Sequence, residues 1–430
     1  MPVISARRPG PTDTWRVSAS GSCVPCIAAI YFNAARCWGS KRQAAQTQSV
    51  ADRRRKARQT GDAKRRAAAA WSRGTLPIVV VDHSVLSAPR VRIALVGVGD
   101  AGAHHLRAIA ALQAQGQVEL VAVCSRDSLR AEGRLAELGL PPTLPYYTTL
   151  DALLHSGRAQ AVILATPDGL QAAEVQACAR AGLHVLVEKP LALYPGEAQQ
   201  AVATAQQSGV VLQVGYHLRH HAAHQLLRSQ AEGWLGRLHN LSLRWAWPDP
   251  ATAGWRARGD GARFWSLAAL GTHCIDLCQW LIDSPIIAYT GLTDTPLSQG
   301  VDRCAEVTLR FASGALAHLS VAVTHRALSR LLLVGELGEV ECLGTFGAQG
   351  TGELWHRPLR KPAEPVSFTP HDPYAAQLQS FVTAVRAGTA PASRPATAPA
   401  DPASGLAQAL KNVELLDALA TQPSDAKLAE

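Results

Sequence analysis

A run of apolar residues and glycines over residues 91–109 constrains the fold of this chain most. It reads VRIALVGVGDAGAHHLRAI, which is typical of a strand, a glycine turn and the start of a helix near Asp100. Gly97 closes the strand with a turn that a side chain would obstruct, Gly99 lets the backbone approach a ligand, and Gly102 lets the helix pack close to the strand. The free N–H groups and positive dipole of a helix N-terminus favour a diphosphate there. The residues predicted to bind this part of a dinucleotide are Gly97, Gly99, Asp100, Ala101 and Gly102.

The end of the next predicted strand, residues 118–127, bears on the choice between two cofactors. An acidic residue at that strand end would bind the ribose 2′-hydroxyl of NAD. Here the strand ends in Cys124, Ser125 and Arg126, and Asp127 comes one or two positions too late. A hydroxyl and a guanidinium fit a 2′-phosphate, because Arg offers a forked set of donors and a permanent charge. We therefore predict that Ser125 and Arg126 favour NADP(H), with NAD(H) and a solvated Arg126 as the alternative.

Two further strand ends are predicted to line the same cleft. The segments AVILATP and HVLVEKP each follow a helical pattern, and ligands of open parallel sheets lie beyond the carboxyl ends of the strands. Lys189 stands between a buried strand and a proline, where a cation can hold a substrate oxygen. A surface lysine paired with Glu188 is the alternative. The residues predicted to line the cleft from these two strand ends are Thr166, Pro167, Glu188 and Lys189.

Length and composition favour more than one globular domain. The chain has 430 residues, of which 47% are hydrophobic, and this is more than one core usually holds. No apolar stretch is long enough to span a bilayer, so no membrane partner is expected. The nine cysteines are odd in number and do not show the regular spacing of the disulfide-bonded cysteines in small secreted domains. We therefore predict a cytoplasmic location.

The excess of positive charge lies at the start of the chain. Residues 1–90 hold 16 Lys and Arg but 4 Asp and Glu. The remaining residues hold 26 Lys and Arg and 29 Asp and Glu. Little apolar periodicity accompanies these charges, so we predict that residues 1–88 form a basic, disordered extension, for which a start codon assigned too far upstream is one explanation. Because no aromatic residues interleave with the arginines, a nucleic-acid partner is not expected.

Four ordered motifs resemble those of the Gfo/Idh/MocA oxidoreductases, which include glucose-fructose oxidoreductase and inositol dehydrogenase. They are GVGDAGAHH, ATPDGLQ, HVLVEKPLAL and GTHCIDLCQWL, and the resemblance covers most of residues 89–420. It implies an α/β Rossmann domain with a parallel sheet, followed by an α+β domain with a large, mostly antiparallel open sheet that commonly serves oligomerisation. The domains expected from it are an extension (1–88), a Rossmann domain (89–216), a substrate-binding and oligomerisation domain (217–420) and a tail (421–430). A homo-oligomer, dimer or tetramer, is implied as well.

The predicted helix over residues 271–281 carries the candidate proton-transfer group. His273 and Asp276 are three residues apart and share a helix face, and the pKa of histidine lies near the working pH. In the resembling enzymes, the lysine of the EKP motif hydrogen-bonds the substrate oxygen and this histidine exchanges its proton during hydride transfer. The resemblance therefore implies catalytic roles for Lys189 and His273. A helix histidine satisfied by a backbone carbonyl is the alternative.

The chain departs from the family pattern at one position, because Ala269 stands where an aspartate is usual. The missing carboxylate could slow the chemistry or indicate a different substrate. The candidates to replace this carboxylate are Arg263, Trp265, His217 and Arg219. Four histidines between residues 217 and 224 suggest a metal, but no further ligands complete a shell, so none is predicted. The residues predicted to contact the substrate are His217, Arg219, Trp265 and Asp276.

Together these features predict an NADP-preferring oxidoreductase. Hydride would pass between nicotinamide C4 and a carbinol or carbonyl carbon of a sugar, polyol or related cyclic small molecule. The alternative is a catalytically weak or inactive NAD(P)-binding regulator of the same fold, which the alanine at position 269 would explain. Substrate specificity is expected to lie in loops such as residues 247–265, which hold three tryptophans.

Overall fold

The computed structural model describes most of the chain beyond residue 88. The described residues are 89–141, 143–249, 254–257, 262–295, 297, 300–388 and 402–422. The predicted basic extension, the proline-rich segment 389–401 and the end of the predicted tail lie outside them. The predictions for these segments therefore stay predictions.

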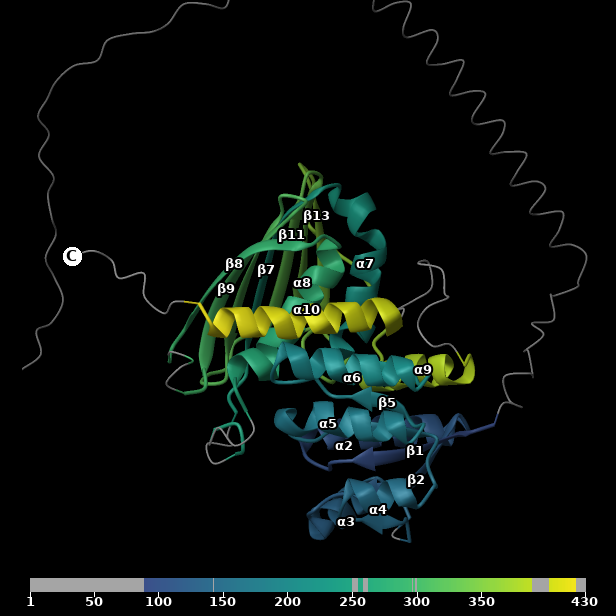
Figure 1. Ribbon diagram of the computed structural model, residues 1–430. Coiled ribbons are helices and arrows are strands. Elements are labelled where there is room, and N and C mark those ends of the chain that lie inside the picture. The colour runs from purple at the N-terminus through teal and green to yellow at the C-terminus, as the bar shows by residue number, and fades with distance from the viewer. Residues whose placement is uncertain are drawn as a thin grey trace, which may run out of the picture. The chain divides into compact units, whose positions relative to one another are not determined.

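The first sheet is parallel and has the strand order β3-β2-β1-β4-β5-β6 (Figure 1). Its central strand, VRIALV, is apolar at nearly every position because both faces of the sheet are covered. Ile93 and Leu95 enter one apolar core, whereas Ala94 and Val96 enter the other. The strands are β1 (Val91–Val96), β2 (Val118–Cys124), β3 (Tyr146–Tyr147), β4 (Ala161–Leu164), β5 (His184–Val187) and β6 (Leu212–Val214).

Helices connect these strands and start where the sequence supplies capping groups. The Asp127 side chain accepts a hydrogen bond from the backbone N–H of Arg130, and the Thr149 side chain accepts one from Ala152. Pro195 begins another helix at a position where no intrahelical N–H is needed. The helices are α2 (Asp100–Ala114), α3 (Ser128–Glu137), α4 (Leu150–His155), α5 (Asp168–Arg180) and α6 (Pro195–Gln207). The predicted Rossmann arrangement is confirmed.

The second sheet has eight strands in the order β14-β13-β12-β11-β7-β10-β9-β8, and it is antiparallel except between β7 and β10. This confirms the predicted large, mostly antiparallel sheet. Burial alternates along its strands, as in β9, because one face packs on the core. Gly314, at a positive φ of 88°, makes the turn between β9 and β10. The strands are β7 (Leu238–Ala246), β8 (Ile286–Thr293), β9 (Cys304–Phe311), β10 (Leu316–Ala322), β11 (Arg330–Gly335), β12 (Gly338–Leu343), β13 (Glu353–Pro358) and β14 (Glu364–Pro365).

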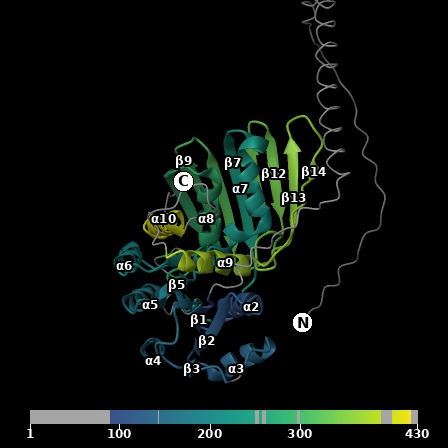
Figure 2. The same ribbon diagram turned by 90° about the vertical axis from the view of Figure 1, so that its right-hand side faces the viewer.

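Helices α7 (Ala222–Leu235) and α8 (Thr272–Ile282) cover the inner face of this sheet (Figure 2). A short 3-10 turn, η2 (His217–His220), precedes α7, and a π-helical turn, η3 (Leu267–Gly271), leads directly into α8. Cys274, Ile275 and Leu277 of α8 are fully buried against the strands. The two turns and the start of α8 therefore lie where the second sheet meets the carboxyl ends of the parallel strands.

The last two helices return to the parallel sheet. Helix α9 (Pro373–Arg386) packs against α2, and its Phe381 is fully buried in the core beneath β1. Helix α10 (Pro402–Ala420) packs against α6 and β6 and also against α8, with Ala409 buried in the other core of the parallel sheet. Figure 1 shows α10 running between α6 and the second sheet. The domain boundary predicted at residue 216 therefore assigns α9 and α10 to the second domain. In space, both helices pack on the parallel sheet of the first domain.

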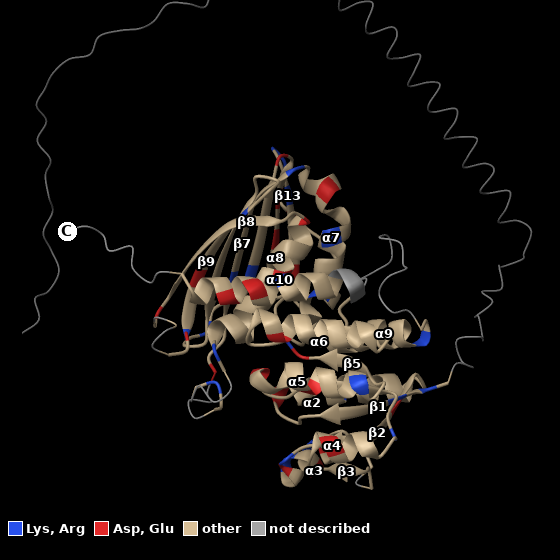
Figure 3. Cartoon of the chain, viewed as in Figure 1, with Lys and Arg blue, Asp and Glu red and all other residues tan. Residues whose placement is uncertain are grey.

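Charged side chains of both signs are spread over the described elements (Figure 3). Positions of Lys and Arg and positions of Asp and Glu alternate along the cartoon, in line with the near balance of charges after residue 90. None of the helices in the described part of the chain is long and apolar enough to cross a membrane.

Candidate active site

A cleft of about 940 Å³ lies at the carboxyl edge of the parallel sheet. Its walls come from the ends of β1, β2, β4 and β5, from η2, from the junction of η3 and α8, from residues 254–257 and from Tyr374 of α9. Open α/β sheets bind ligands at this edge. The size is that of a site for a cofactor-sized molecule.

The glycine turn between β1 and α2 forms the floor of one end. Gly97 has a φ of +91°, and a Cβ atom there would lie 2.4 Å from the carbonyl oxygen of Ala165. A Cβ atom on Gly102 would lie 2.2 Å from the carbonyl oxygen of Gly97, whereas one on Gly99 would meet nothing within 4 Å. Two glycines are thus required by packing, and the third faces open space beside the N-terminus of α2. This arrangement fits the diphosphate of a dinucleotide. Gly97, Gly99, Asp100 and Ala101 line the cleft, and Gly102 does not.

The end of β2 brings two arginines to the cleft. Ser125 and Arg126 line it, as the sequence predicts, and so does Arg130 of α3. The Asp127 carboxylate accepts the backbone N–H of Arg130 at 2.9 Å and lies 3.5 Å from the Arg130 guanidinium. Asp127 is therefore engaged as the cap of α3. Arg130 is missing from the sequence prediction, although its spacing of four residues from Arg126 is the signal that would have found it.

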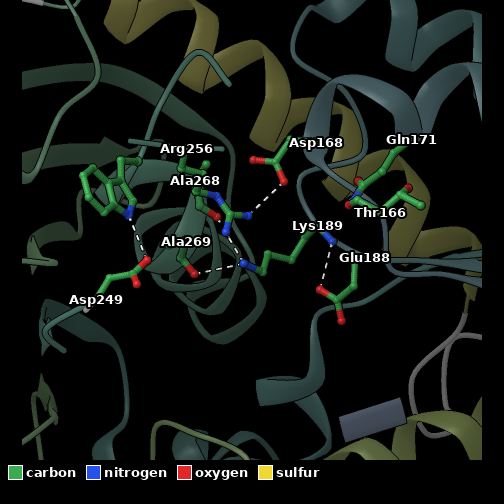
Figure 4. A network of polar contacts seen from close by, with 10 residues as sticks. Thr166, Asp168, Gln171, Glu188, Lys189, Asp249, Arg256, Ala268 and Ala269 are labelled. Carbon is green, nitrogen blue, oxygen red and sulfur yellow. Dashed lines mark hydrogen bonds and ion pairs between the residues drawn. The ribbon is translucent and has the colours of Figure 1, made fainter. Parts of the chain in front are cut away.

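Lys189 follows the end of β5 and lines the same cleft. It is 9% exposed, and its ammonium donates hydrogen bonds to the carbonyl oxygens of Ala269 at 2.9 Å and Ala268 at 3.2 Å (Figure 4). Burial and then the nearby Arg256 guanidinium lower the pKa of Lys189 to about 8. The alternative of a surface lysine paired with Glu188 is wrong, because the Glu188 carboxylate instead lies 2.9 Å from Nε2 of His105.

Two histidine rings stand beside Lys189 in the cleft. His273 at the start of α8 and His217 of η2 meet edge to face with their centroids 4.7 Å apart, and His217 stacks on Tyr374 at 4.5 Å. Nδ1 of His273 and both ring nitrogens of His217 have no hydrogen-bond partner among the described residues. Burial lowers the pKa of His273 well below its usual value and that of His217 to about 3, so both rings are neutral at pH 7. A neutral imidazole can accept a proton.

A short segment of the loop in which substrate specificity was expected also lines the cleft. Arg256 donates to Oδ1 of Asp168 at 2.9 Å (Figure 4). The Arg256 guanidinium also lies 4.2 Å from the centroid of the Trp255 ring. Asp168 is 1% exposed, and its Oδ2 atom has no partner among the described residues. Trp245 of β7 completes this wall, and its ring lies 5.7 Å from that of His273. Thr166 and Pro167 line the cleft as predicted.

Three of the four residues predicted to contact the substrate lie outside the cleft lining. Arg219 and Asp276 form a buried, two-pronged ion pair with distances of 2.7 and 2.6 Å. The Trp265 indole donates to Asp249 at 3.1 Å, and Arg263 pairs with Asp417 of α10. These side chains pair with other residues inside the protein, and of the four predicted substrate contacts His217 is the one that lines the cleft.

The cluster of histidines after β6 is spread among separate partners. His224 contacts the carbonyl oxygen of Leu218 and the hydroxyl of Thr345, both at 2.9 Å, and His221 contacts the carbonyl oxygen of Thr351 at 3.2 Å. Within the described ranges, no group of three or more His, Cys, Asp or Glu side chains is placed to hold a metal ion.

Two family models match the chain. One, described as an oxidoreductase family with an NAD-binding Rossmann fold, matches residues 91–216. The other is the GFO/IDH/MocA C-terminal domain, which matches residues 220–341. Together they cover the parallel sheet, β7 to β11 of the second sheet and most of the residues that line the cleft.

Curated relatives are similar over most of this region. The chain is 27% identical over 295 residues to D-xylose 1-dehydrogenase (NADP(+)) 2 of Haloferax volcanii, covering 68% of this chain and 89% of the relative. It is 29% identical over 294 residues to 1,5-anhydro-D-fructose reductase of Ensifer adhaerens, covering 64% and 83%. A shorter match of 195 residues is 33% identical to the rhizopine catabolism protein MocA of Rhizobium meliloti, covering 45% and 57%.

Solved structures share the fold. The aldose-aldose oxidoreductase from Caulobacter crescentus, complexed with glycerol, superposes with a TM-score of 0.66 at 22% identity, covering 77% of this chain and 96% of the other. A 3-ketoreductase from Actinomadura kijaniata, in complex with NADP and TDP-benzene, gives the same score and identity and covers 77% and 97%. The chain belongs to the Gfo/Idh/MocA family of oxidoreductases with an NAD-binding Rossmann fold.

Proposed function

We propose that the chain transfers hydride between NADP(H) and a carbinol or carbonyl carbon of a sugar, polyol or related cyclic molecule. One observation carries the proposal: Lys189, His273 and His217 line the same cleft as the glycine turn. A cation, a neutral base and a dinucleotide cradle are the parts that such a reaction requires. Relatives named as dehydrogenases and reductases of sugars support this substrate class.

The roles of the side chains follow from their positions. When bound, the nicotinamide ring supplies the acceptor or donor of the hydride at C4. Lys189 donates a hydrogen bond to the reacting oxygen of the substrate and polarises it. In the oxidative direction, neutral His273 accepts the hydroxyl proton as the C–H electron pair leaves with the hydride. In reduction, His273 first takes up a proton and then gives it to the oxygen. His217 holds a second hydroxyl through its unpartnered ring nitrogens.

The preference for NADP(H) rests on the end of β2. Ser125, Arg126 and Arg130 all line the cleft. The one acidic residue at this strand end, Asp127, caps α3 and is paired with Arg130. Two guanidinium groups with a single engaged carboxylate favour a 2′-phosphate over a 2′-hydroxyl.

Substrate recognition is assigned to the aromatic wall opposite Lys189. Trp245 and Trp255 offer flat faces on which the C–H groups of a sugar ring pack, and Arg256 stands between Trp255 and Asp168. An acidic sugar is also compatible with this arginine, so the panel of substrates should include uronic and aldonic acids.

We further propose that the enzyme is cytoplasmic and homo-oligomeric. In this proposal, residues 89–216 form the cofactor domain and residues 217–420 form the substrate domain. The cysteines in the described part of the chain are free thiols, which suits a reducing compartment. Light scattering during gel filtration tests the oligomer directly, with a dimer or tetramer expected and a monomer contradicting it.

Fluorescence titration of cofactor-stripped protein with NADPH and NADH tests the function first. Tighter binding of NADPH is expected, followed by turnover with members of a sugar and polyol panel. Lys189→Met and His273→Gln should each lose turnover while they still bind NADPH. Binding without turnover by the parent protein across the panel would instead favour the nucleotide-binding regulator, and binding of neither cofactor would overturn the proposal.

A further inference from the structure

Lys189 is held by the main chain of the π-helical turn η3. We propose that this turn positions the lysine for catalysis, because the carbonyl oxygens of Ala268 and Ala269 take two of its three N–H groups and leave one for the substrate oxygen. The inference rests on the proposed function, since it assumes that Lys189 meets the substrate. It assigns to backbone atoms a task that a side-chain carboxylate would otherwise perform.

The turn has an unusual backbone geometry at this point. The N–H group of Thr272 bonds the carbonyl oxygen of Leu267, five residues earlier, instead of the four residues that an α-helix requires. π-helical turns are rare and occur mostly as single turns at functional sites. Here the widened turn lies immediately before His273, so one local feature presents both the lysine acceptors and the candidate base.

A buried carboxylate fixes the turn from behind. Asp302, which precedes β9 and has no exposed surface, accepts the backbone N–H of Leu267 at 2.7 Å and that of Trp265 at 2.9 Å. It also accepts a hydrogen bond from the Ser266 hydroxyl. These bonds satisfy the free N–H groups at the start of the turn and tie it to the second sheet. The two carbonyl oxygens are therefore held in place before any substrate arrives.

The carboxylates near Lys189 are engaged elsewhere. Glu188 pairs with His105 at 2.9 Å, and Asp168 pairs with Arg256 at 2.9 Å. Figure 4 shows the Arg256 guanidinium between Asp168 and the lysine ammonium. Lys189 therefore has neutral acceptors within hydrogen-bond reach, which orient it without cancelling its charge.

The charge balance around Lys189 follows from this arrangement. Burial lowers its pKa most, and Arg256 lowers it further, whereas Glu188 and Asp168 oppose the shift. The other titratable groups that face it are His273 and His217, which are neutral at pH 7. A carboxylate at position 269 would stabilise the ammonium form, because an opposite charge within about 4–6 Å typically shifts a pKa by about 1–3 units.

Trace acetylation of the full-length protein tests the inference without any substrate. The rate at which acetic anhydride modifies Lys189 is measured by peptide mass spectrometry across pH, with the exposed Lys361 and Lys411 as internal standards. The midpoint for Lys189 should lie near pH 8, below those of the two standards. In Ala269→Asp it should rise by at least about one pH unit, and in the matched neutral control Ala269→Asn it should stay with the parent. A parental midpoint equal to that of Lys361, or equal midpoints in the Asp and Asn variants, would overturn the inference.

A second pair of variants covers the case in which Ala269→Asp does not fold. Arg256→Gln removes the neighbouring cation and should raise the Lys189 midpoint, and Arg256→Lys should restore it. If the Lys189 midpoint does not change in Arg256→Gln, the ammonium does not lie beside this arginine as its contacts with Ala268 and Ala269 require, and the inference is contradicted. NADPH titration of the same samples separates the two proposals, because loss of cofactor binding in the parent protein contradicts the function and not the lysine contacts.

Discussion

The carboxylate of Glu188 and the imidazole of His105 lie 2.9 Å apart in a buried contact between β5 and α2. Glu188 is adjacent to Lys189 in sequence, yet its side chain points to the helix that carries the glycine turn. Burial would raise the pKa of Glu188, but the His105 hydrogen bond and charge outweigh it and lower that pKa to about 2. The contact links the cofactor-binding helix directly to the strand end that holds the lysine.

Replacing His105 by Leu should destabilise the protein by about 3–5 kcal/mol at pH 7, because a buried carboxylate then loses its partner. Glu188→Gln should cost less, since an amide still hydrogen-bonds the imidazole. The stabilisation by a carboxylate of lowered pKa is complete above its unfolded value and is lost as pH falls through its folded value. Urea unfolding at several pH values checks this, and a His105→Leu loss that does not shrink between pH 5 and pH 2 would contradict it.

Gly97 and Gly99 should respond differently to alanine. Gly97→Ala places a methyl group against the Ala165 carbonyl at a positive φ and should cost at least about 1–3 kcal/mol of stability. Gly99→Ala meets no protein atom, so stability should change by less than about 0.5 kcal/mol. Its methyl group projects toward the diphosphate and should weaken NADPH binding at least about tenfold. Thermal unfolding and titration measure both, and an intact affinity in Gly99→Ala would remove the diphosphate from this turn.

The two arginines at the end of β2 should set the cofactor preference. Arg126→Ala should weaken NADPH binding by about 10–100-fold, the effect of losing a hydrogen bond to a charged group, and leave NADH binding unchanged. Arg130→Ala should have a smaller effect, because its guanidinium is partly engaged by Asp127. Arg180→Ala, at the exposed end of α5, is the matched control. Equal losses for NADPH and NADH in Arg126→Ala would show that this residue does not read the 2′-phosphate.

The Arg219–Asp276 pair should matter for stability and not for cofactor binding. Arg219→Met leaves a buried carboxylate and should cost about 3–5 kcal/mol, whereas the double variant Arg219→Met with Asp276→Leu should recover most of this loss. Urea unfolding of the parent, the two single variants and the double variant gives the coupling between the two positions. Single variants that fold as well as the parent but lose turnover would restore the substrate role predicted from the sequence.

Carbonyl reduction should slow as pH rises through about 8. Lys189 is protonated below its pKa of about 8 and neutral above it, and the ammonium polarises a carbonyl oxygen more strongly than the amine does. The pH profile of kcat/KM for a ketone found in the substrate panel measures the descending limb of this pH dependence. A limb near pH 10, the usual range of lysine, would show that the surroundings do not shift this group.

Local patterns predicted the parallel sheet, the glycine turn and the cleft positions of Lys189 and Thr166. Each depends on a few consecutive residues whose spacing determines a strand end or a helix start. The mostly antiparallel sheet was expected only from the family resemblance, and the short edge strand β14, of two residues, has no periodicity to detect.

Contacts between distant segments explain what the sequence analysis missed. Arg219 stands near His217 in the chain, and its polarity suggested a substrate contact, but it meets Asp276 across 57 positions. Tyr374 reaches the cleft from an amphipathic helix whose position depends on the complete fold. The carbonyl oxygens that hold Lys189 leave no signal in residue types, because every residue has one.

The return of α9 and α10 to the parallel sheet has a consequence for the order of synthesis. A ribosome releases β1 to β6 first, but the helices that bury Phe381 and Ala409 against them emerge only after the whole second sheet has been made. Domains usually fold as units during translation. Here the parallel sheet keeps part of its apolar surface uncovered until α10 has left the exit tunnel, so the nascent chain depends on α9 and α10, or on a chaperone until then, to close its cofactor-binding half.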